Sequence, residues 1–169
     1  MARWRLQEVP VRRAALRARD RALERASARD RVLSYLLDTN VVSEPRKPAP
    51  DVNVAAWLNA AAAEALFVSV LSLGEVRRSI ELLRRRHDDH QADVIETWLA
   101  QLKADFAERL ITVSAAVAER WGRLNAIRPL PVVDGLLAAT AIEHGLTLVT
   151  RDTAAVADTG VAVLDPWSS

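Results

Sequence analysis

The sequence predicts an α/β fold, a three-layer α/β/α sandwich with a central, mainly parallel sheet. Two observations support this prediction. Short apolar runs alternate along the chain with segments of helical periodicity, and those runs contain almost no polar residue. Strands that are apolar on both faces are typical of a parallel sheet covered by helices on both sides. A length of 169 residues suits one domain with a hydrophobic core and leaves little room for a second.

The elements of the first half follow from local signals. Ser34–Leu37 is a short apolar run that ends at an acidic residue, and the stretch PRKPAP at 45–50 predicts a loop. Asp51–Ala63 carries Val54, Trp57 and Leu58 at helical spacing. Leu66–Val70 reads as a strand, and Ser72 is expected to open a helix that runs to about Arg86.

The second half continues the alternation. Residues 91–107 place six large apolar side chains on one helical face, which predicts a long amphipathic helix. Leu110–Val113 is a strand, and Ser114 caps a helix to about Ile127 that Pro129 and Pro131 end. Asp134–His144 is a helix that Gly145 stops. The last strands are Leu146–Thr150 and Val161–Leu164.

Composition narrows the functional classes. Half of the residues are hydrophobic and only 5 are Gly and 7 Pro, which excludes a disordered or collagen-like chain. The absence of Cys excludes disulfides, thiolate zinc sites and cysteine nucleophiles. No apolar run approaches the roughly 18 residues needed to span a bilayer, and residues 1–30 lack a signal-peptide core. We therefore expect a cytoplasmic protein without a membrane partner.

The net charge of +1 hides two different segments. Residues 1–33 hold 10 Arg and 4 acids, whereas residues 34–169 hold 13 Lys or Arg and 18 acids. We expect 34–169 to be the folded domain and 1–33 to be a basic extension. Three interpretations of the extension stay open: a solvated helix, an arm that touches nucleic acid, or sequence that precedes the native start near Val32.

Four carboxylates stand at the ends of predicted elements: Asp38, Glu75, Asp134 and Asp152. Each also has a local explanation, because Ser72 and Glu75 have the spacing of a capping box, Asp134 is a plausible N-cap and Asp152 could close a turn. Parallel strands end at one edge of a sheet and the following helices begin there, so the four acids should converge. Such a cluster needs a cation, and oxygen ligands favour Mg²⁺, with Mn²⁺ as a substitute.

Five motifs carry a resemblance to a known family. They are LLDTNVVSE at 36–44, LGEVR at 73–77, VDGLLAATA at 133–141, LVTRDT at 148–153 and LDPW at 164–167. In this order they resemble a PIN domain, and most closely the VapC toxins of the FitB-like branch. The resemblance covers about residues 33–168. One departure is the pair Ala155-Val156, which stands where many relatives carry Asp-Phe.

The resemblance implies a magnesium-dependent ribonuclease, the toxin of a type II toxin–antitoxin pair. Asp38, Glu75, Asp134 and Asp152 become its catalytic and metal-binding acids, and Thr39, Asn40 and Thr150 become polar supports beside them. A water activated by the metal would hydrolyse the RNA phosphodiester bond. The resemblance also implies a DNA-binding antitoxin, of ribbon-helix-helix type, and a homodimer.

RNA binding has to come from local cations, because the domain itself is acidic. The candidates are Arg46 and Lys47 after the first strand, Arg77 and Arg78 beyond Glu75, and Arg151. Two other functions stay open. One is a weakly catalytic or non-catalytic PIN subunit of an antitoxin complex that binds operator DNA, and the other is a phosphotransferase of the haloacid dehalogenase type with Asp38 as nucleophile. The phosphotransferase interpretation is weakened because such enzymes carry a second Asp two residues after the nucleophile, where this sequence has Asn40.

Overall fold

Five parallel strands form one sheet in the computed structural model, which describes residues 33–168; the predicted N-terminal extension lies outside these residues. The strands are β1 (Tyr35–Leu37), β2 (Leu66–Ser69), β3 (Leu110–Ile111), β4 (Thr147–Val149) and β5 (Val163–Leu164), in the order β3-β2-β1-β4-β5. The first strand, β1, thus lies in the centre, with β2 and β3 on one side and β4 and β5 on the other. A ligand crevice is expected beyond the carboxyl end of β1, where the direction of winding reverses.

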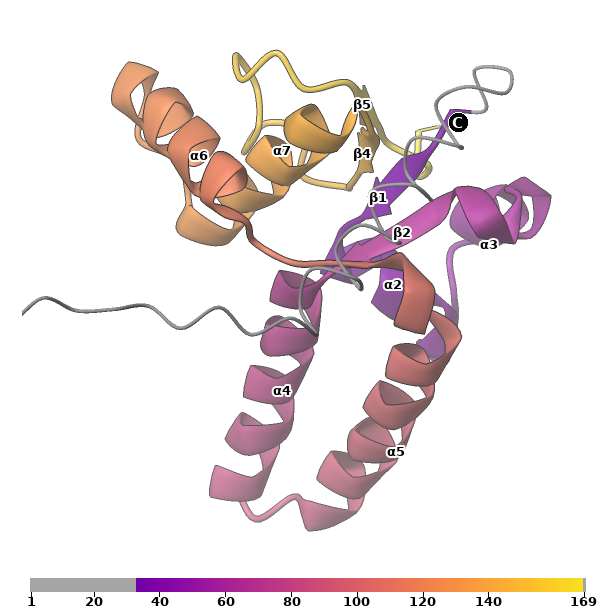
Figure 1. The fold of residues 1–169 in the computed structure, drawn as a ribbon. Coiled ribbons are helices and arrows are strands. Elements are labelled where there is room, and N and C mark those ends of the chain that lie inside the picture. The colour runs from indigo at the N-terminus through magenta and orange to yellow at the C-terminus, as the bar shows by residue number, and fades with distance from the viewer. Residues whose placement is uncertain (1–32, 169) are drawn as a thin grey trace, which may run out of the picture. The chain divides into compact units, whose positions relative to one another are not determined.

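Six helices accompany the sheet within the described residues. They are α2 (Thr39–Ser43), α3 (Val52–Ala60), α4 (Val70–Arg85), α5 (Asp89–Asp105), α6 (Ala115–Ile127) and α7 (Val132–His144). In Figure 1, α3 and α7 lie on opposite sides of the strands. The predicted sandwich with a parallel sheet is therefore confirmed.

The core follows from strand register and from the alternation of side chains along each strand. Leu37 pairs with Val68 on one side and with Val149 on the other, and these three side chains pack with Val54 of α3. The preceding residue of each strand faces the other side of the sheet, where α7 contacts β1 and β4. Leu36 on that side is fully buried.

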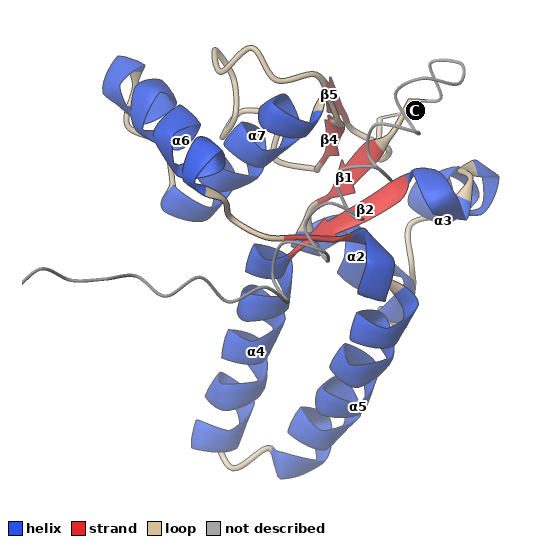
Figure 2. Ribbon diagram, in the orientation of Figure 1, coloured by secondary structure: helices blue, strands red, loops and turns tan. Residues whose placement is uncertain are grey.

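The helices α4 and α5 form an antiparallel pair that extends away from the sheet (Figure 2). Their shared interface buries Val76 and Ile80 of α4 against Ala92 and Leu99 of α5. This pair has its own small core, so the C-terminal part of α4 can project from the sheet without losing its apolar contacts.

Helix boundaries agree with the caps in most places. Asp51 and Ser114 accept hydrogen bonds from the first-turn amides of α3 and α6, and Gly145, with φ of 63°, ends α7. The capping box predicted at Ser72 is wrong. The N-cap of α4 is Ser69, whose hydroxyl accepts from the amide of Leu71, so the helix begins directly where β2 ends.

The short helix α2, directly after β1, was not expected from the sequence, because five residues are too few to show helical periodicity. Among the described residues, no helix combines the length and apolarity that crossing a bilayer requires.

Candidate functional site

The carboxylate of Asp38 is the most buried of the four predicted acids and the best anchored. The backbone amide of Asp38 donates to the carbonyl of Val149 at 3.0 Å, which extends the pairing of β1 with β4 by one residue. The carboxylate accepts three hydrogen bonds: Oδ1 from the amide of Thr39 at 2.6 Å, and Oδ2 from Asn40 Nδ2 at 2.5 Å and from Thr150 Oγ1 at 2.7 Å. Asp38 therefore has a fixed orientation at the carboxyl edge of the central strand.

Two threonines connect Asp38 to two of the other acids. Thr39, whose amide holds Asp38, also donates its hydroxyl to Glu75 Oε2 of α4 at 2.5 Å. Thr150, whose hydroxyl holds Asp38, accepts a bond from the amide of Asp152 at 3.1 Å. These contacts bring together residues that are 36 and 112 positions apart in the chain.

Asp134 reaches the cluster in a different way. It lies in the first turn of α7, but Pro131 occupies the N-cap position, so the capping role considered for Asp134 does not apply. The pKa of Asp134 is raised, first by burial and then by the negative charges of Asp38, Asp152 and Glu75. Asp134 is thus within electrostatic reach of the other three predicted acids.

Burial also raises the pKa of Asp38. The hydrogen bonds from Thr150, Thr39 and Asn40 favour the charged carboxylate and lower the pKa, and the charge of Asp152 raises it. Burial is the largest of these effects, so the net shift is upward. A nearby cation would oppose the shift in both Asp38 and Asp134.

The cluster offers only oxygen ligands, which suit a hard divalent cation. The side-chain oxygen Oδ1 of Asn40, beside Asp38, is buried and has no hydrogen-bond partner among residues 33–168. Within the same residues, no three His, Cys, Asp or Glu side chains lie close enough together to hold a metal on their own. Mg²⁺ usually keeps several waters and binds one or two carboxylates, so the donor set fits magnesium better than a metal that needs a closed protein cage.

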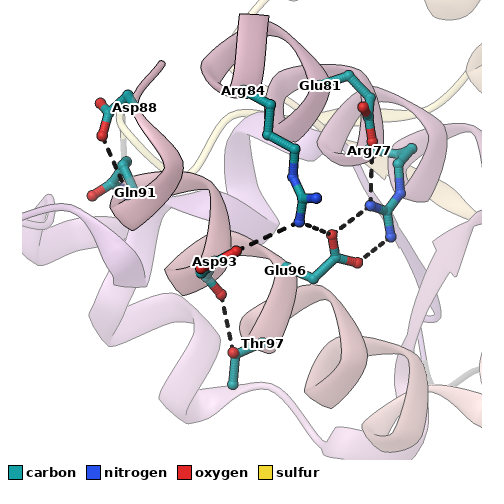
Figure 3. A network of polar contacts seen from close by, with 8 residues as sticks. All are labelled: Arg77, Glu81, Arg84, Asp88, Gln91, Asp93, Glu96 and Thr97. Atoms are coloured by element: carbon teal, nitrogen blue, oxygen red, sulfur yellow. Dashed lines mark hydrogen bonds and ion pairs between the residues drawn. The ribbon is translucent and has the colours of Figure 1, made fainter. Parts of the chain in front are cut away.

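The predicted RNA-contacting residue Arg77 takes part in an internal network (Figure 3). Its guanidinium forms two hydrogen bonds with Glu96 of α5, one of them at 2.6 Å, and lies 3.6 Å from Glu81. Arg84 adds a contact to Glu96 at 3.1 Å. Arg77 therefore ties α4 to α5.

Arg46 and Lys47 also have internal partners. The guanidinium of Arg46 lies 4.3 Å from the centre of the Trp98 ring on α5, and burial lowers its pKa. Lys47 contacts Glu44 at 2.5 Å, and Glu44 is only 3% exposed. The sequence analysis gave Glu44 no role, although its carboxylate also accepts from the amide of Asp51 at 3.0 Å and so fixes the loop between α2 and α3.

Two arginines near the acids keep exposed side chains. Arg78 lies one helical turn beyond Glu75 on α4, and in the described part of the chain it makes no hydrogen bond or ion pair. Arg151 stands between Thr150 and Asp152, and its guanidinium lies 5.6 Å from the centre of the Trp167 ring. Positive charge is thus available one turn from Glu75 and directly beside Asp152 in the chain.

Comparison with known proteins agrees with this geometry. Residues 35–160 match the PIN domain family. The chain is 34% identical over 138 residues to Toxin FitB of Neisseria gonorrhoeae, an alignment that covers 78% of this chain and 97% of that protein. It is 31% identical over 140 residues to VapC ribonuclease Y4jK of Sinorhizobium fredii, covering 78% of this chain and 96% of that protein.

Solved structures give the same result. The crystal structure of FitAcB from Neisseria gonorrhoeae matches with a TM-score of 0.73 and 33% identity, covering 80% of this chain and 99% of the other. The structure of FitAB bound to an IR36 DNA fragment matches with a TM-score of 0.71 and 32% identity, covering 79% and 95%. From its strand order, the arrangement of its acids and these similarities, this chain belongs to the PIN domain family.

Proposed function

We propose that this protein is a Mg²⁺-dependent endoribonuclease that acts as the toxin of a type II toxin–antitoxin pair. The observation that carries the proposal is the hydrogen-bond network at the carboxyl end of β1, in which Thr39 bonds to both Asp38 and Glu75, and Thr150 bonds to both Asp38 and the amide of Asp152. Four acids that repel one another at a sheet edge are a costly arrangement unless a cation occupies it. The names of two relatives, a toxin and a VapC ribonuclease, support the same activity.

In this proposal Asp38, Glu75, Asp134 and Asp152 would form the site for Mg²⁺, or for Mn²⁺ in its place, with one or two of the carboxylates binding the ion directly and the others acting through its waters. When bound, the ion supplies charge neutralisation at the phosphate and lowers the pKa of water. The residues of the chain prepare the site for it. Thr39 orients Asp38 and Glu75 together, Thr150 orients Asp38 and the start of the Asp152 turn, and Asn40 adds a second bond to Asp38.

We assign the RNA contacts to Arg78 and Arg151 instead of Arg46 and Arg77. The last two have their guanidinium groups against Trp98 and Glu96, so using them for RNA would break contacts between α5 and its neighbours. Arg78 and Arg151 are exposed, and they lie close in sequence to Glu75 and Asp152. An unpaired strand suits this arrangement, because its phosphates can reach a cluster that lies at one sheet edge.

The test is cleavage of single-stranded RNA by the purified protein with Mg²⁺ and with EDTA. Asp134→Asn should abolish Mg²⁺-dependent cleavage, and it should also remove the rise in melting temperature that Mg²⁺ gives the parent protein. Asp158→Asn is the matched control, because Asp158 is exposed on the loop after β4 and its φ of 65° suits Asn. Normal cleavage by the Asp134 variant would refute the assignment of that acid.

The partners follow from the same proposal: an RNA substrate, a second copy of this chain, and an antitoxin that binds DNA. The similarity to FitAB bound to DNA also favours the alternative, a weakly catalytic or non-catalytic subunit that serves operator binding. Purification of the complex with the product of the neighbouring gene separates the two. RNA cleavage by the toxin freed from its antitoxin supports the nuclease, whereas operator binding without any cleavage supports the alternative.

A further inference from the structure

Arg128 connects two segments that carry acids of the cluster. It follows the last residue of α6, and its Nη2 donates to the carbonyl oxygens of Ala155 and Ala157, at 3.3 and 2.8 Å. Both carbonyls belong to residues 151–158, the loop after β4, which we name the Asp152 loop. One guanidinium thus binds two backbone positions on the loop that contains Asp152.

The Asp152 loop needs such a contact to keep its acid in place. Asp152 itself is exposed, and its Oδ1 accepts a hydrogen bond from the amide of Ala155 at 3.1 Å. Ala155 therefore bonds to the acid through its N–H and to Arg128 through its carbonyl. Because the same residue makes both bonds, the position of the guanidinium affects the direction in which the Asp152 carboxylate is turned.

On the other side, Arg128 belongs to a stiff connection. Pro129, Leu130 and Pro131 follow it and lead directly into α7, whose first turn contains Asp134. Leu130 is buried, and its amide donates to the side chain of Asn125 at 2.8 Å. Two prolines restrict the backbone further. Arg128 thus links the Asp152 loop to a connection that cannot easily move relative to Asp134.

The partners of Arg128 differ from those of the arginines on the preceding helix α6. Arg120 and Arg123 form ion pairs with Glu143 and Glu119, whereas Arg128 forms no ion pair in the described part of the chain. Its Nε is buried there without a partner, which is an unfavourable position for a charged group. Its hydrogen bonds go to the backbone of the Asp152 loop, so Arg128 can fix the conformation of that loop, as a positioning residue does.

We propose that Arg128 is a positioning residue that holds Asp152 next to the other three acids by fixing the backbone of the Asp152 loop. The proposal rests on the nuclease function only for its consequence in catalysis. A guanidinium presents several donors in one plane, so it can hold two carbonyls at once. A lysine in its place can hold one with the same geometry, and a methionine can hold neither.

The experiment compares Arg128→Met and Arg128→Lys with Arg123→Met, a control that removes an exposed arginine of the preceding helix α6. The first readout is amide hydrogen exchange in the Mg²⁺-free protein. In Arg128→Met the amide of Ala155 should exchange about tenfold faster, which corresponds to the loss of an ordinary hydrogen bond. Arg128→Lys should show an intermediate rate, and the control should match the parent.

The second readout is the Mg²⁺ concentration at half-maximal effect, measured both from the rise in melting temperature and from RNA cleavage. Arg128→Met should raise this concentration about five- to tenfold and leave the cleavage rate at saturating Mg²⁺ within about twofold of the parent. A residue that only stabilises the fold would lower the melting temperature and leave the midpoint unchanged.

The results distinguish failure of the Arg128 proposal from failure of the proposed function. Equal exchange at Ala155 and equal Mg²⁺ midpoints in Arg128→Met and Arg123→Met would overturn the proposal. If Arg128→Met does not fold, Arg128→Lys carries the same comparison, and a parent-like midpoint with parent-like exchange would again overturn it. If the parent protein neither cleaves RNA nor responds to Mg²⁺, the proposed function fails, and the exchange rate at Ala155 alone decides whether Arg128 holds the loop.

Discussion

Replacement of Gly135 by Ala should test how α7 is placed against α6. Gly135 follows Asp134 and is buried. A Cβ atom at this position would lie 3.0 Å from Cδ1 and 3.1 Å from Nε1 of Trp121, and 3.2 Å from Cβ of Leu130. These distances are too short for carbon contacts, so either the indole or the helix has to move by a few tenths of an ångström. Gly122 of α6 is the matched control, because a Cβ there meets nothing within 4 Å.

The expected free energies differ in sign between the two positions. Replacing Gly by Ala inside a helix stabilises a protein by about 1 kcal/mol. Gly122→Ala should gain about this amount. At Gly135 the same gain is opposed by overpacking, which costs about 1–3 kcal/mol in a well-packed interior. Gly135→Ala should therefore range from nearly neutral to about 2 kcal/mol less stable than the parent, and about 1–3 kcal/mol less stable than Gly122→Ala.

Urea unfolding, followed by circular dichroism, gives both values, and the slopes of the two transitions should agree with that of the parent. Because α7 carries Asp134 in its first turn, Gly135→Ala should also raise the Mg²⁺ midpoint, whereas Gly122→Ala should leave it unchanged. If Gly135→Ala proves as stabilising as Gly122→Ala, the close approach to Trp121 does not limit the packing of α7, and the reasoning fails.

Three further predictions concern charge. The pKa values of Asp38 and Asp134 are raised in the folded state, so their contribution to stability is fully present below the unfolded pKa, about 3.9, and is lost as pH rises through the folded values. Asp134→Asn should therefore be more stable than the parent toward urea at pH 7 in EDTA. Lower stability of this variant would contradict the prediction. Glu44 behaves in the opposite way, because its pKa is lowered, first by the hydrogen bond from Lys47. The ionised carboxylate therefore contributes stability above the unfolded pKa, and this contribution is lost on acidification. Glu44→Gln should cost on the order of 1 kcal/mol at pH 7 and should flatten the acid side of the stability profile measured by urea unfolding. Arg78→Gln and Arg151→Gln should each weaken binding of single-stranded RNA and reduce the salt slope of the affinity by about one unit or slightly less in a fluorescence titration, and unchanged slopes would exclude these residues as phosphate contacts.

Much of the fold was predictable from the sequence because its signals are local. Apolar runs predicted the strands to within two residues at each end, and caps such as Asp51 and Ser114 marked helix starts correctly. The start of α4 could not be predicted, because Ser69 is a polar residue within an otherwise apolar run and Val70 fits a strand as well as a helix. Tertiary packing decides between the two.

For the site, parallel topology carries the prediction that Asp38, Glu75, Asp134 and Asp152 lie at one sheet edge. The effect of the other three charges on Asp134 agrees with that placement. The directions of side chains do not follow from topology, and they govern which arginines are available. Neighbours on a helix such as Arg77 and Arg78 point about 100° apart, so only the packing of α5 shows that the first is engaged and the second is exposed.

The acceptor sites of Asp38 have a consequence for anything that approaches it. A carboxylate has about four lone-pair positions, two on each oxygen. On Oδ2 both are used, by Asn40 and Thr150, and on Oδ1 one is used, by the amide of Thr39. Among the described residues, one acceptor position on Oδ1 therefore remains for a further donor or a cation. Asp38 can thus bind a cation through one oxygen only, without rearrangement of these hydrogen bonds.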